Sequence, residues 1–328
     1  MALRPDFIDA HIMEWELRLH SVYRPYRDKW PSRLFHHAPL ENAALMLKDG
    51  NLRSRNDPSN RKTVDVAAAG VIDNRSVAHN YSRLYFRPRT PTQWHIEGIR
   101  KPGECSYGDS SHAPILVMFI FDARSILTTP GVRFSDRNMQ LNYATTGDTE
   151  EFFSSIPFDK VFHEGATSDR STIDARCAEV LAPSPMKLAG ALQWIYCRSA
   201  AERDTLLHFL GDHADRWRGR IQISDDLLVF EKKYVFVEEV SIDQDGVVGA
   251  FNPRRDRQKI HVAVQALASD GKLAIDFLNS SMEARPPAPS SRWRFPQKLR
   301  KGTYLITIRI EGHLAYQSFM TIGADNLI

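Results

Sequence analysis

The hydrophobic pattern of the chain changes at about residue 222, and this change determines how many domains the chain can form. Before it, helical spacing and isolated strand-like runs alternate. After it come short β-rich pieces, broken by turn signals such as DQDG at 243–246 and RPPAPSSR at 285–292. Closely spaced strands with such turns are typical of a β-sandwich. A chain of 328 residues is also long enough for two domains.

The first part of the chain has clear element signals. Apolar residues at helical spacing predict a helix over 5–20, and the basic, aromatic connector RPYRDKWP follows at 24–31. A short strand is expected over 33–36, and then a helix that begins at Pro39 and ends at Gly50. We therefore divide the chain into a helix and connector (1–32), a mixed domain (33–221) and an all-β domain (222–328).

Further along, the pattern is more uneven. The run ILVMFIF at 115–121 is typical of a strand buried on both faces. Residues 122–170 carry few periodic signals and are interpreted as a lid or substrate loop. Ser199 and Glu202 have the spacing of a capping box, which predicts a helix that reaches about Trp217.

Composition excludes several classes of protein. No apolar run approaches the roughly 20 residues of a membrane span, and the N-terminus lacks a signal-peptide core, so we expect a cytoplasmic protein. The three cysteines show no CxxC pair and there is no HExxH, so neither a disulfide framework nor a metal site is expected. The net charge of +3 is too small to indicate a nucleic-acid partner by itself, although basic residues are clustered.

Common nucleotide and hydrolase motifs are missing from the sequence. It contains no GxxxxGK[ST] loop, no strand-linked GxGxxG and no GxSxG elbow. Instead, polar segments occur at the ends of expected strands and helices. They are FHHAPLENAALMLKDGNLRSRN (35–56), IDNR (72–75), YFRPRTPT (85–92), FSDRN (134–138) and ARCAEVLA (175–182).

In this order, the segments resemble the DarT family of NAD-dependent ADP-ribosyltransferases, toxins that modify bases in nucleic acid. The match covers about 33–210. The resemblance implies an α+β fold with a split β-sheet core and helices, and the separate strand pattern after residue 222 predicts an all-β, immunoglobulin-like sandwich. It also implies NAD as co-substrate, no metal, and a single-stranded nucleic acid as acceptor. Whether the acceptor is DNA or RNA stays open.

The resemblance also assigns the residues of the site. Glu179 takes the position of the catalytic glutamate, and Arg75 falls at or next to an arginine that contacts the NAD phosphates and assists the reaction. His36 falls on the histidine that binds the NAD ribose, Asn42 on a polar contact at a helix start, and Tyr85 on the strand that lines the nicotinamide pocket.

Some positions depart from the family. Ala38 stands where a threonine is usual, Ser76 where a second arginine is common, and Cys177 where a longer polar side chain is expected. These departures bear on affinity and on the exact target more than on the class of reaction.

The chemistry accounts for the residue types. Breaking the bond between nicotinamide and ribose builds positive charge on the ribose, as in glycoside hydrolysis. A fixed carboxylate such as Glu179 stabilises that charge and can take a proton from the attacking base. An arginine binds pyrophosphate oxygens through a fork of donors, and an aromatic ring beside nicotinamide excludes water.

Candidates for nucleic-acid contacts are Trp30 in the connector, Arg89 and Arg137. The β domain carries further basic runs, at 254–259 and 292–301. We favour a protein-binding role for this domain, because loops of β-sandwiches commonly recognise proteins. By the resemblance, one such partner is a macrodomain antitoxin, and the chain itself acts as a prokaryotic toxin or phage-defence effector.

Simpler readings of the same residues stay open. Glu179 fits the solvent face of an edge strand, His36 a core histidine and Tyr85 ordinary packing. Asp136 and Arg137 fit either a local salt bridge or a substrate loop. The alternative function is a catalytically inactive fold of this kind that serves as a nucleic-acid or protein binding module.

Overall fold

The computed structural model describes residues 2–61, 63–64, 78–105, 108 and 111–323. The chain divides into two units of structure. The first consists of Met1–Ile96, Val117–Tyr196 and Arg220–Glu231, and the second of Glu97–Leu116, Cys197–Gly219 and Lys232–Ile328. In the part of the chain described, no helix is both long and apolar enough to cross a membrane.

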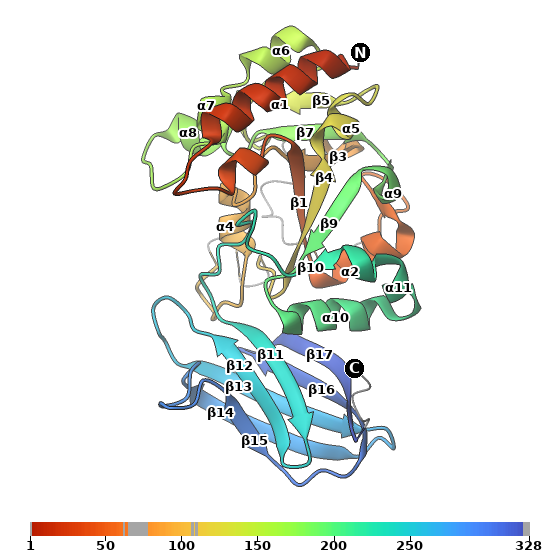
Figure 1. The fold of residues 1–328 in the computed structure, drawn as a ribbon, viewed down its shortest axis with the longest axis vertical. Helices are drawn as coiled ribbons and strands as arrows, with labels where there is room; N and C mark the ends of the chain where they lie inside the picture. The colour runs from red at the N-terminus through yellow and green to blue at the C-terminus, as the bar shows by residue number, and fades with distance from the viewer. Residues whose placement is uncertain (1, 62, 65–77, 106–107, 109–110, 324–328) are drawn as a thin grey trace. The chain divides into compact units, whose positions relative to one another are not determined.

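An eight-stranded sheet forms the centre of the first unit, with β1, β4 and β9 side by side in Figure 1. Its pairs are antiparallel for β1 with β3, β3 with β7, β5 with β7, β5 with β6 and β4 with β9, whereas β9 and β10 are parallel. In sheet order the strands are β10 (Ile221–Gln222), β9 (Leu192–Tyr196), β4 (Leu116–Asp122), β1 (Arg33–Pro39), β3 (Tyr81–Tyr85), β7 (Glu179–Pro183), β5 (Arg133–Ser135) and β6 (Thr146–Gly147).

The element predictions for this unit are largely confirmed. Helix α1 (Pro5–Leu19) occupies the predicted helical stretch, and α2 (Leu40–Asp49) ends at Gly50, whose φ of 73° is the left-handed conformation that glycine favours. Val117–Phe121 in β4 are fully buried, as the apolar run predicted. The run DVAAAGVID (65–73), whose alanines could form a further helix, lies outside the described residues.

The interpretation of 122–170 as a lid or loop is wrong. This stretch contains β5, β6 and the helices α5 (Ala123–Leu127), α6 (Glu150–Ser155) and α7 (Phe158–Val161), and α8 (Arg170–Ala175) follows directly. The side chains of Asp122, Thr149 and Asp169 accept hydrogen bonds from main-chain N–H groups at the starts of α5, α6 and α8. Elements this short do not produce a periodic pattern over the window that a sequence analysis needs.

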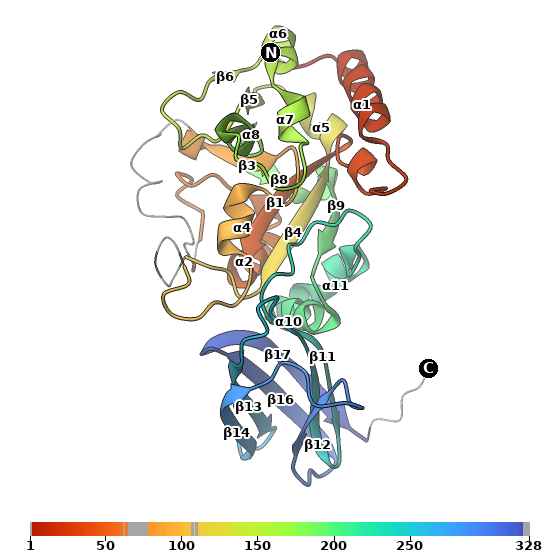
Figure 2. The same ribbon diagram turned by 90° about the vertical axis from the view of Figure 1, so that its left-hand side faces the viewer.

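Helix α1 packs on these short helices, and Figure 2 shows it at the same end of the sheet as α5, α6 and α7. Phe7 meets Phe153 edge to face at 5.9 Å, and Trp15 lies 5.6 Å from Phe162. The ring of His11 is 4.5 Å from Phe158. The remaining elements of the unit are α4 (Pro91–Ile96), α9 (Leu188–Ala191) and the short pair β2 (Asn51–Leu52) and β8 (Met186–Lys187).

The second unit contains the predicted β-rich region as two antiparallel sheets. Strands β11 (Phe236–Asp243), β12 (Gly246–Asn252) and β15 (Trp293–Pro296) form one sheet; β14 (Leu273–Met282), β13 (Ile260–Ala268), β16 (Gly302–Ile310) and β17 (His313–Ile322) form the other. Gly246 is required at the β11–β12 turn, because a Cβ there would lie 2.2 Å from the carbonyl oxygen of Phe295.

The predicted capping-box helix also groups with the second unit. The Ser199 side chain accepts from the N–H of Glu202 at the start of α10 (Ala200–Leu210), and α11 (Ala214–Trp217) ends at the predicted residue. Ser199 also donates to the carbonyl oxygen of Val237 at 2.6 Å. This region therefore makes contacts with the β-rich part that neither its place in the chain nor its helical pattern indicates.

Candidate active site on strands β3 and β7

Glu179 is the first residue of β7 and is only 1 % exposed. Strand β7 lies between β3 and β5, and the N–H of Glu179 donates to Ser135 Oγ at 2.9 Å. The reading of Glu179 as a solvent-facing residue of an edge strand is therefore wrong. A carboxylate in such a place requires a partner, because an uncompensated buried charge is costly.

That partner is Arg83, on the neighbouring strand. Its Nε donates to Glu179 Oε2 at 2.5 Å, and its Nη2 donates to Oε1, so the contact is bidentate. Burial by itself would lower the pKa of Arg83, but the Glu179 carboxylate outweighs burial and raises the pKa, so the guanidinium stays charged. Sequence reasoning missed Arg83, although a charged residue within the strand-like run YSRLY is a signal that could have found it.

The strand register defines which side chains share the face of Glu179. Tyr85 lies directly opposite Glu179, and Arg83 lies opposite Leu181. Side chains two apart on a strand point the same way, so these four residues share one face. Tyr85 is 9 % exposed, and its ring stacks on His37 with centroids 5.4 Å apart and planes 1° apart.

The two histidines of β1 have different environments. His36 Nδ1 lies 2.9 Å from the main-chain oxygen of Arg83, and since a carbonyl oxygen only accepts, Nδ1 carries the proton. In neutral His36, the lone pair is then on Nε2, which suits a hydroxyl donor. Burial, followed by the charges of His36 and Arg83, lowers the pKa of His37 to about 3, so that ring is neutral.

Two predicted NAD contacts are not tested by this arrangement. Asn42 donates through Nδ2 to the carbonyl oxygen of Val64 at 2.6 Å and accepts from the N–H of Thr63 at 3.1 Å, so it positions residues 63–64. Its contact with NAD remains a prediction. Arg75 lies outside the described residues.

Trp30 is fully buried, and its indole N–H donates to the carbonyl oxygen of Leu227 at 3.0 Å. A ring in this position cannot stack on a nucleobase, so the prediction that Trp30 contacts nucleic acid is wrong. The composition of the connector is the same whether its tryptophan faces solvent or the core, so the sequence alone did not reveal that Trp30 is buried.

Several arginines instead surround the turn 161–165 that follows α7. Arg89 forms an ion pair with Glu164, and its guanidinium lies 5.8 Å from the Trp30 ring. Arg87, 3 % exposed, donates to the carbonyl oxygens of Pro88 and Val161 at 2.9 and 3.2 Å.

These cations lie close enough to repel one another, although burial is the main cause of the shift at Arg87. Burial, then the charges of Arg176 and Arg89, lower the pKa of Arg87 to about 9. Arg27 and Arg176 donate to the carbonyl oxygens of Phe162 and Gly165 at 2.9 and 2.7 Å, so they belong to the same cluster. We call the set Arg27, Arg87, Arg89 and Arg176 the arginine cluster. Crowded cations of this kind create a positive potential that attracts anions.

Arg137 lies in a loop on the Glu179 face of the sheet. It forms a local salt bridge with Asp136, with Nε 2.9 Å from Oδ2, which was one of the two readings left open. The loop packs on Leu181 through Met139. The guanidinium of Arg137 lies 5.1 Å from the ring of Tyr143, which is 50 % exposed. An exposed aromatic ring with an arginine beside it is suited to base stacking, and sequence reasoning missed this ring.

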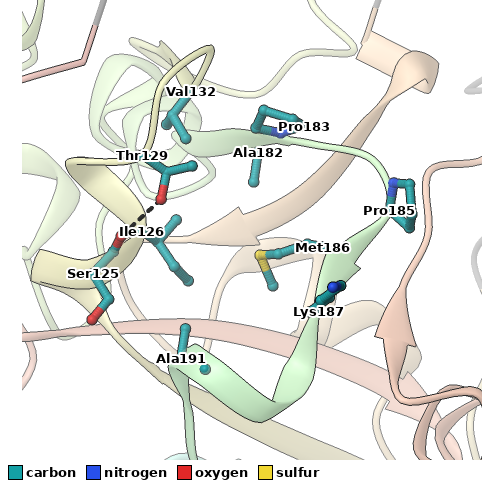
Figure 3. Close-up of a pocket in the computed structure, with 11 residues that line it drawn as sticks. Ser125, Ile126, Thr129, Val132, Ala182, Pro183, Pro185, Met186, Lys187 and Ala191 are labelled. Carbon is teal, nitrogen blue, oxygen red and sulfur yellow. Dashed lines mark hydrogen bonds between the residues drawn. The ribbon is translucent and has the colours of Figure 1, made fainter.

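A separate pocket of about 400 Å³ lies at the far end of β7 (Figure 3). It is lined by residues of α5, the turn after α5, β7 and the 183–191 segment, including Ile126, Thr129, Ala182 and Met186. Ala182 is three positions from Glu179, so the two side chains point to opposite faces of the strand. This pocket is therefore not the space in front of the Glu179 carboxylate.

Thiol and metal chemistry find little support in the described residues. Burial raises the pKa of the Cys177 thiol, beside Glu179 in the chain, to about 11, so it is not a thiolate at neutral pH. Among the residues described, no group of three or more His, Cys, Asp or Glu side chains is placed to hold a metal ion.

Several basic residues of the second unit form ion pairs with acidic residues. Arg254 is 3 % exposed and forms ion pairs with Glu104 and Asp256 at 2.6 and 2.8 Å. Arg292 and Arg294 pair with Glu239 and Asp243, each at 2.7 Å. Paired charges of this kind offer little net potential to a nucleic acid.

Comparisons with known proteins are consistent with this geometry. The model of a protein family described as "ssDNA thymidine ADP-ribosyltransferase, DarT" matches residues 35–227. A structure of Thermus sp. 2.9 DarT in complex with ADP-ribosylated ssDNA is 20% identical, with a TM-score of 0.50, and the match covers 60% of this chain and 96% of that one. A search of curated proteins found no match.

Two other solved structures are more distant in shape. Thermus sp. 2.9 DarT in complex with NAD+ is 19% identical over 60% of this chain and 97% of that one, with a TM-score of 0.47. Thermosipho africanus DarTG in complex with ADP-ribose is 16% identical over 62% of this chain and 52% of that one, with a TM-score of 0.43.

Proposed function

This chain belongs to the DarT family of single-stranded DNA thymidine ADP-ribosyltransferases, and from this premise we propose that it transfers ADP-ribose from NAD to thymidine in single-stranded DNA. The observation that carries the proposal for the site is the placement of Glu179. Its carboxylate is buried and held by the bidentate contact of Arg83, which supports the catalytic role that the resemblance to the family assigns to Glu179.

In the proposed reaction, the bond between ribose and nicotinamide breaks and its electron pair leaves with nicotinamide. The developing positive charge on the ribose is stabilised by the Glu179 carboxylate, which then takes the proton that the thymine base loses as it attacks. His36 is proposed to bind the ribose, as the resemblance implies, and the stacked pair of Tyr85 and His37 is proposed to form an aromatic wall. Such a wall excludes water from the reactive ribose.

The acceptor strand is proposed to bind on the side of Arg137, Tyr143 and Arg89. Tyr143 is the exposed ring for stacking, with Arg137 beside it. The four residues of the arginine cluster outnumber Glu164, their acidic partner, and are proposed to supply the positive potential that a phosphate backbone requires. This placement extends the sequence prediction for Arg89 and Arg137 and replaces Trp30.

We also propose that the chain acts as a toxin in the cytoplasm, where NAD and single-stranded DNA occur together, and that a macrodomain antitoxin removes the modification. The second unit is proposed as the protein-binding part. The pairing of its basic side chains with acidic ones supports protein recognition over nucleic-acid binding there.

The test is incubation of the purified protein with labelled NAD and, separately, thymidine-containing single-stranded DNA, the same DNA without thymidine, single-stranded RNA, and host protein. Mass spectrometry should find one ADP-ribose on the thymidine-containing DNA alone. Glu179→Gln should abolish the transfer, and Glu150→Gln, which changes the same functional group in an exposed pair with Arg4, should retain it.

Each unexpected outcome has a defined meaning. Equal transfer by Glu179→Gln and the parent would contradict the role of Glu179. Transfer to RNA or protein in place of DNA would contradict the proposed acceptor. No NAD consumption with any acceptor would favour the alternative, an inactive fold that serves as a binding module.

A further inference from the structure

Arg83 contacts both of the β-sheet residues proposed to act on the NAD ribose. Its guanidinium donates to the two carboxylate oxygens of Glu179, and its main-chain oxygen accepts from His36 Nδ1 at 2.9 Å. Sequence reasoning did not single out Arg83, and the proposed chemistry described so far does not use it. One residue of β3 therefore orients a side chain on each neighbouring strand, β1 and β7.

The pattern of hydrogen bonds leaves the Glu179 carboxylate able to act. An ionised carboxylate has about four acceptor positions, two on each oxygen. Arg83 takes one on each oxygen through Nε and Nη2. The other position on each oxygen can accept a ribose hydroxyl or the proton of the attacking base. Arg83 thus fixes the plane of the carboxylate without occupying all of its acceptor positions.

We propose that Arg83 is a positioning residue that sets the orientation of the Glu179 carboxylate for the transfer. The inference rests on the proposed function, because it assigns Arg83 to the same reaction. Arginine suits this role because its planar fork restricts a carboxylate in two directions, whereas lysine makes a point contact. The strand pairing of β3 with β7 supplies the rigid support, with Arg83 opposite Leu181 and Tyr85 opposite Glu179.

Arg133 is the matched control for this residue. It lies on β5, on the other side of β7, and its position also pairs with Leu181. Its contacts run to Thr146 at 3.3 Å and Asp148 at 4.0 Å, away from Glu179. Replacing Arg133 by methionine removes an arginine of similar exposure and leaves the contacts of Glu179 in place.

The experiment measures kcat and KM for NAD and for a thymidine-containing oligonucleotide with the parent, Arg83→Met, Arg83→Lys, Arg83→Ala and Arg133→Met. A misoriented carboxylate is expected to lower kcat roughly a hundredfold in Arg83→Met, since displacements of about 1 Å have effects of that size. Both KM values should change little. Arg83→Lys should recover part of kcat, and added guanidinium should restore activity to Arg83→Ala but not to a Glu179→Gln variant.

Several results would overturn the inference. Unchanged kcat in Arg83→Met would show that orientation by Arg83 is unnecessary, and raised kcat would show that Arg83 restrains Glu179 instead. A rise in the KM for NAD at constant kcat would make Arg83 a direct NAD contact. Loss of folding in Arg83→Met, checked by circular dichroism, leaves Arg83→Lys and the guanidinium rescue to decide. If the parent protein itself transfers no ADP-ribose, that result contradicts the proposed function, whereas a defect confined to the Arg83 variants bears on the inference about Arg83.

Discussion

The substitution Glu179→Gln should lower stability as well as activity, because it breaks a bidentate ion pair. The Glu179 side chain is 1 % exposed and that of Arg83 is 28 % exposed. Removing one partner of a fully buried pair costs about 3–5 kcal/mol, since the other charge stays buried. Water screens part of the charge of Arg83, so we expect a loss of ~2–3 kcal/mol. This is smaller than the ~5–15 kcal/mol that holds a typical domain folded, so the fold should persist.

Thermal unfolding followed by circular dichroism measures this loss. With about 2–4 °C per kcal/mol for a domain of this size, Tm should fall by roughly 4–12 °C. A double-mutant cycle with Arg83→Met should give an interaction energy of at least ~1 kcal/mol, because the two residues are in direct contact. Glu150→Gln, in an exposed pair, should stay within about 0.5 kcal/mol of the parent. Additive single effects, or an unchanged Tm in Glu179→Gln, would refute the pair as described.

Three further predictions concern other parts of the chain. In the second unit, Glu202→Gln should lower the free energy of unfolding by ~3 kcal/mol, since Glu202 and Arg198 are each 1 % exposed and hydrogen-bonded to each other. Denaturant unfolding measures this loss, and a midpoint equal to that of the parent would contradict it. Tyr143→Ala should weaken oligonucleotide binding by about 1–3 kcal/mol while NAD hydrolysis without DNA stays constant; an equal loss of both would contradict base stacking. Burial lowers the pKa of His11 to about 4, and burial, then His36 and Arg83, lowers that of His37 to about 3, so the unfolded state binds more protons below pH 6.5. The part of the free energy of unfolding that depends on these two histidines should therefore be fully present above about pH 6.5. It should fall by roughly 1.4 kcal/mol per pH unit and histidine as pH decreases towards 5. Urea unfolding that gives equal stability at about pH 7 and pH 5 would contradict this.

The predictions that held depend on local chemistry. The apolar run at 115–121, the helix stop at Gly50 and the capping pair Ser199 and Glu202 require only neighbours in the chain. The family motifs are also local, and they singled out Glu179 for a catalytic role that stays a proposal, although its burial was not predictable from the run Val180–Ala182 alone.

The predictions that failed depend on partners far apart in the chain. Trp30 is buried because the carbonyl oxygen of Leu227, 197 positions away, accepts from its indole N–H. The short helices α6 and α7 pack against α1, which comes more than 130 positions earlier in the chain. No periodic pattern within 122–170 carries that information.

By itself, the sequence determined the family and the class of reaction, and it singled out Glu179 as the proposed catalytic residue, because these depend on which residue types occur in which order. Only the tertiary structure decided what surrounds that glutamate. Arg83 precedes Glu179 by 96 positions, and antiparallel pairing of β3 with β7 brings the two charges together. Composition and spacing cannot specify such a pair, because the energy of a charge depends on burial and distance, and both are set by the fold.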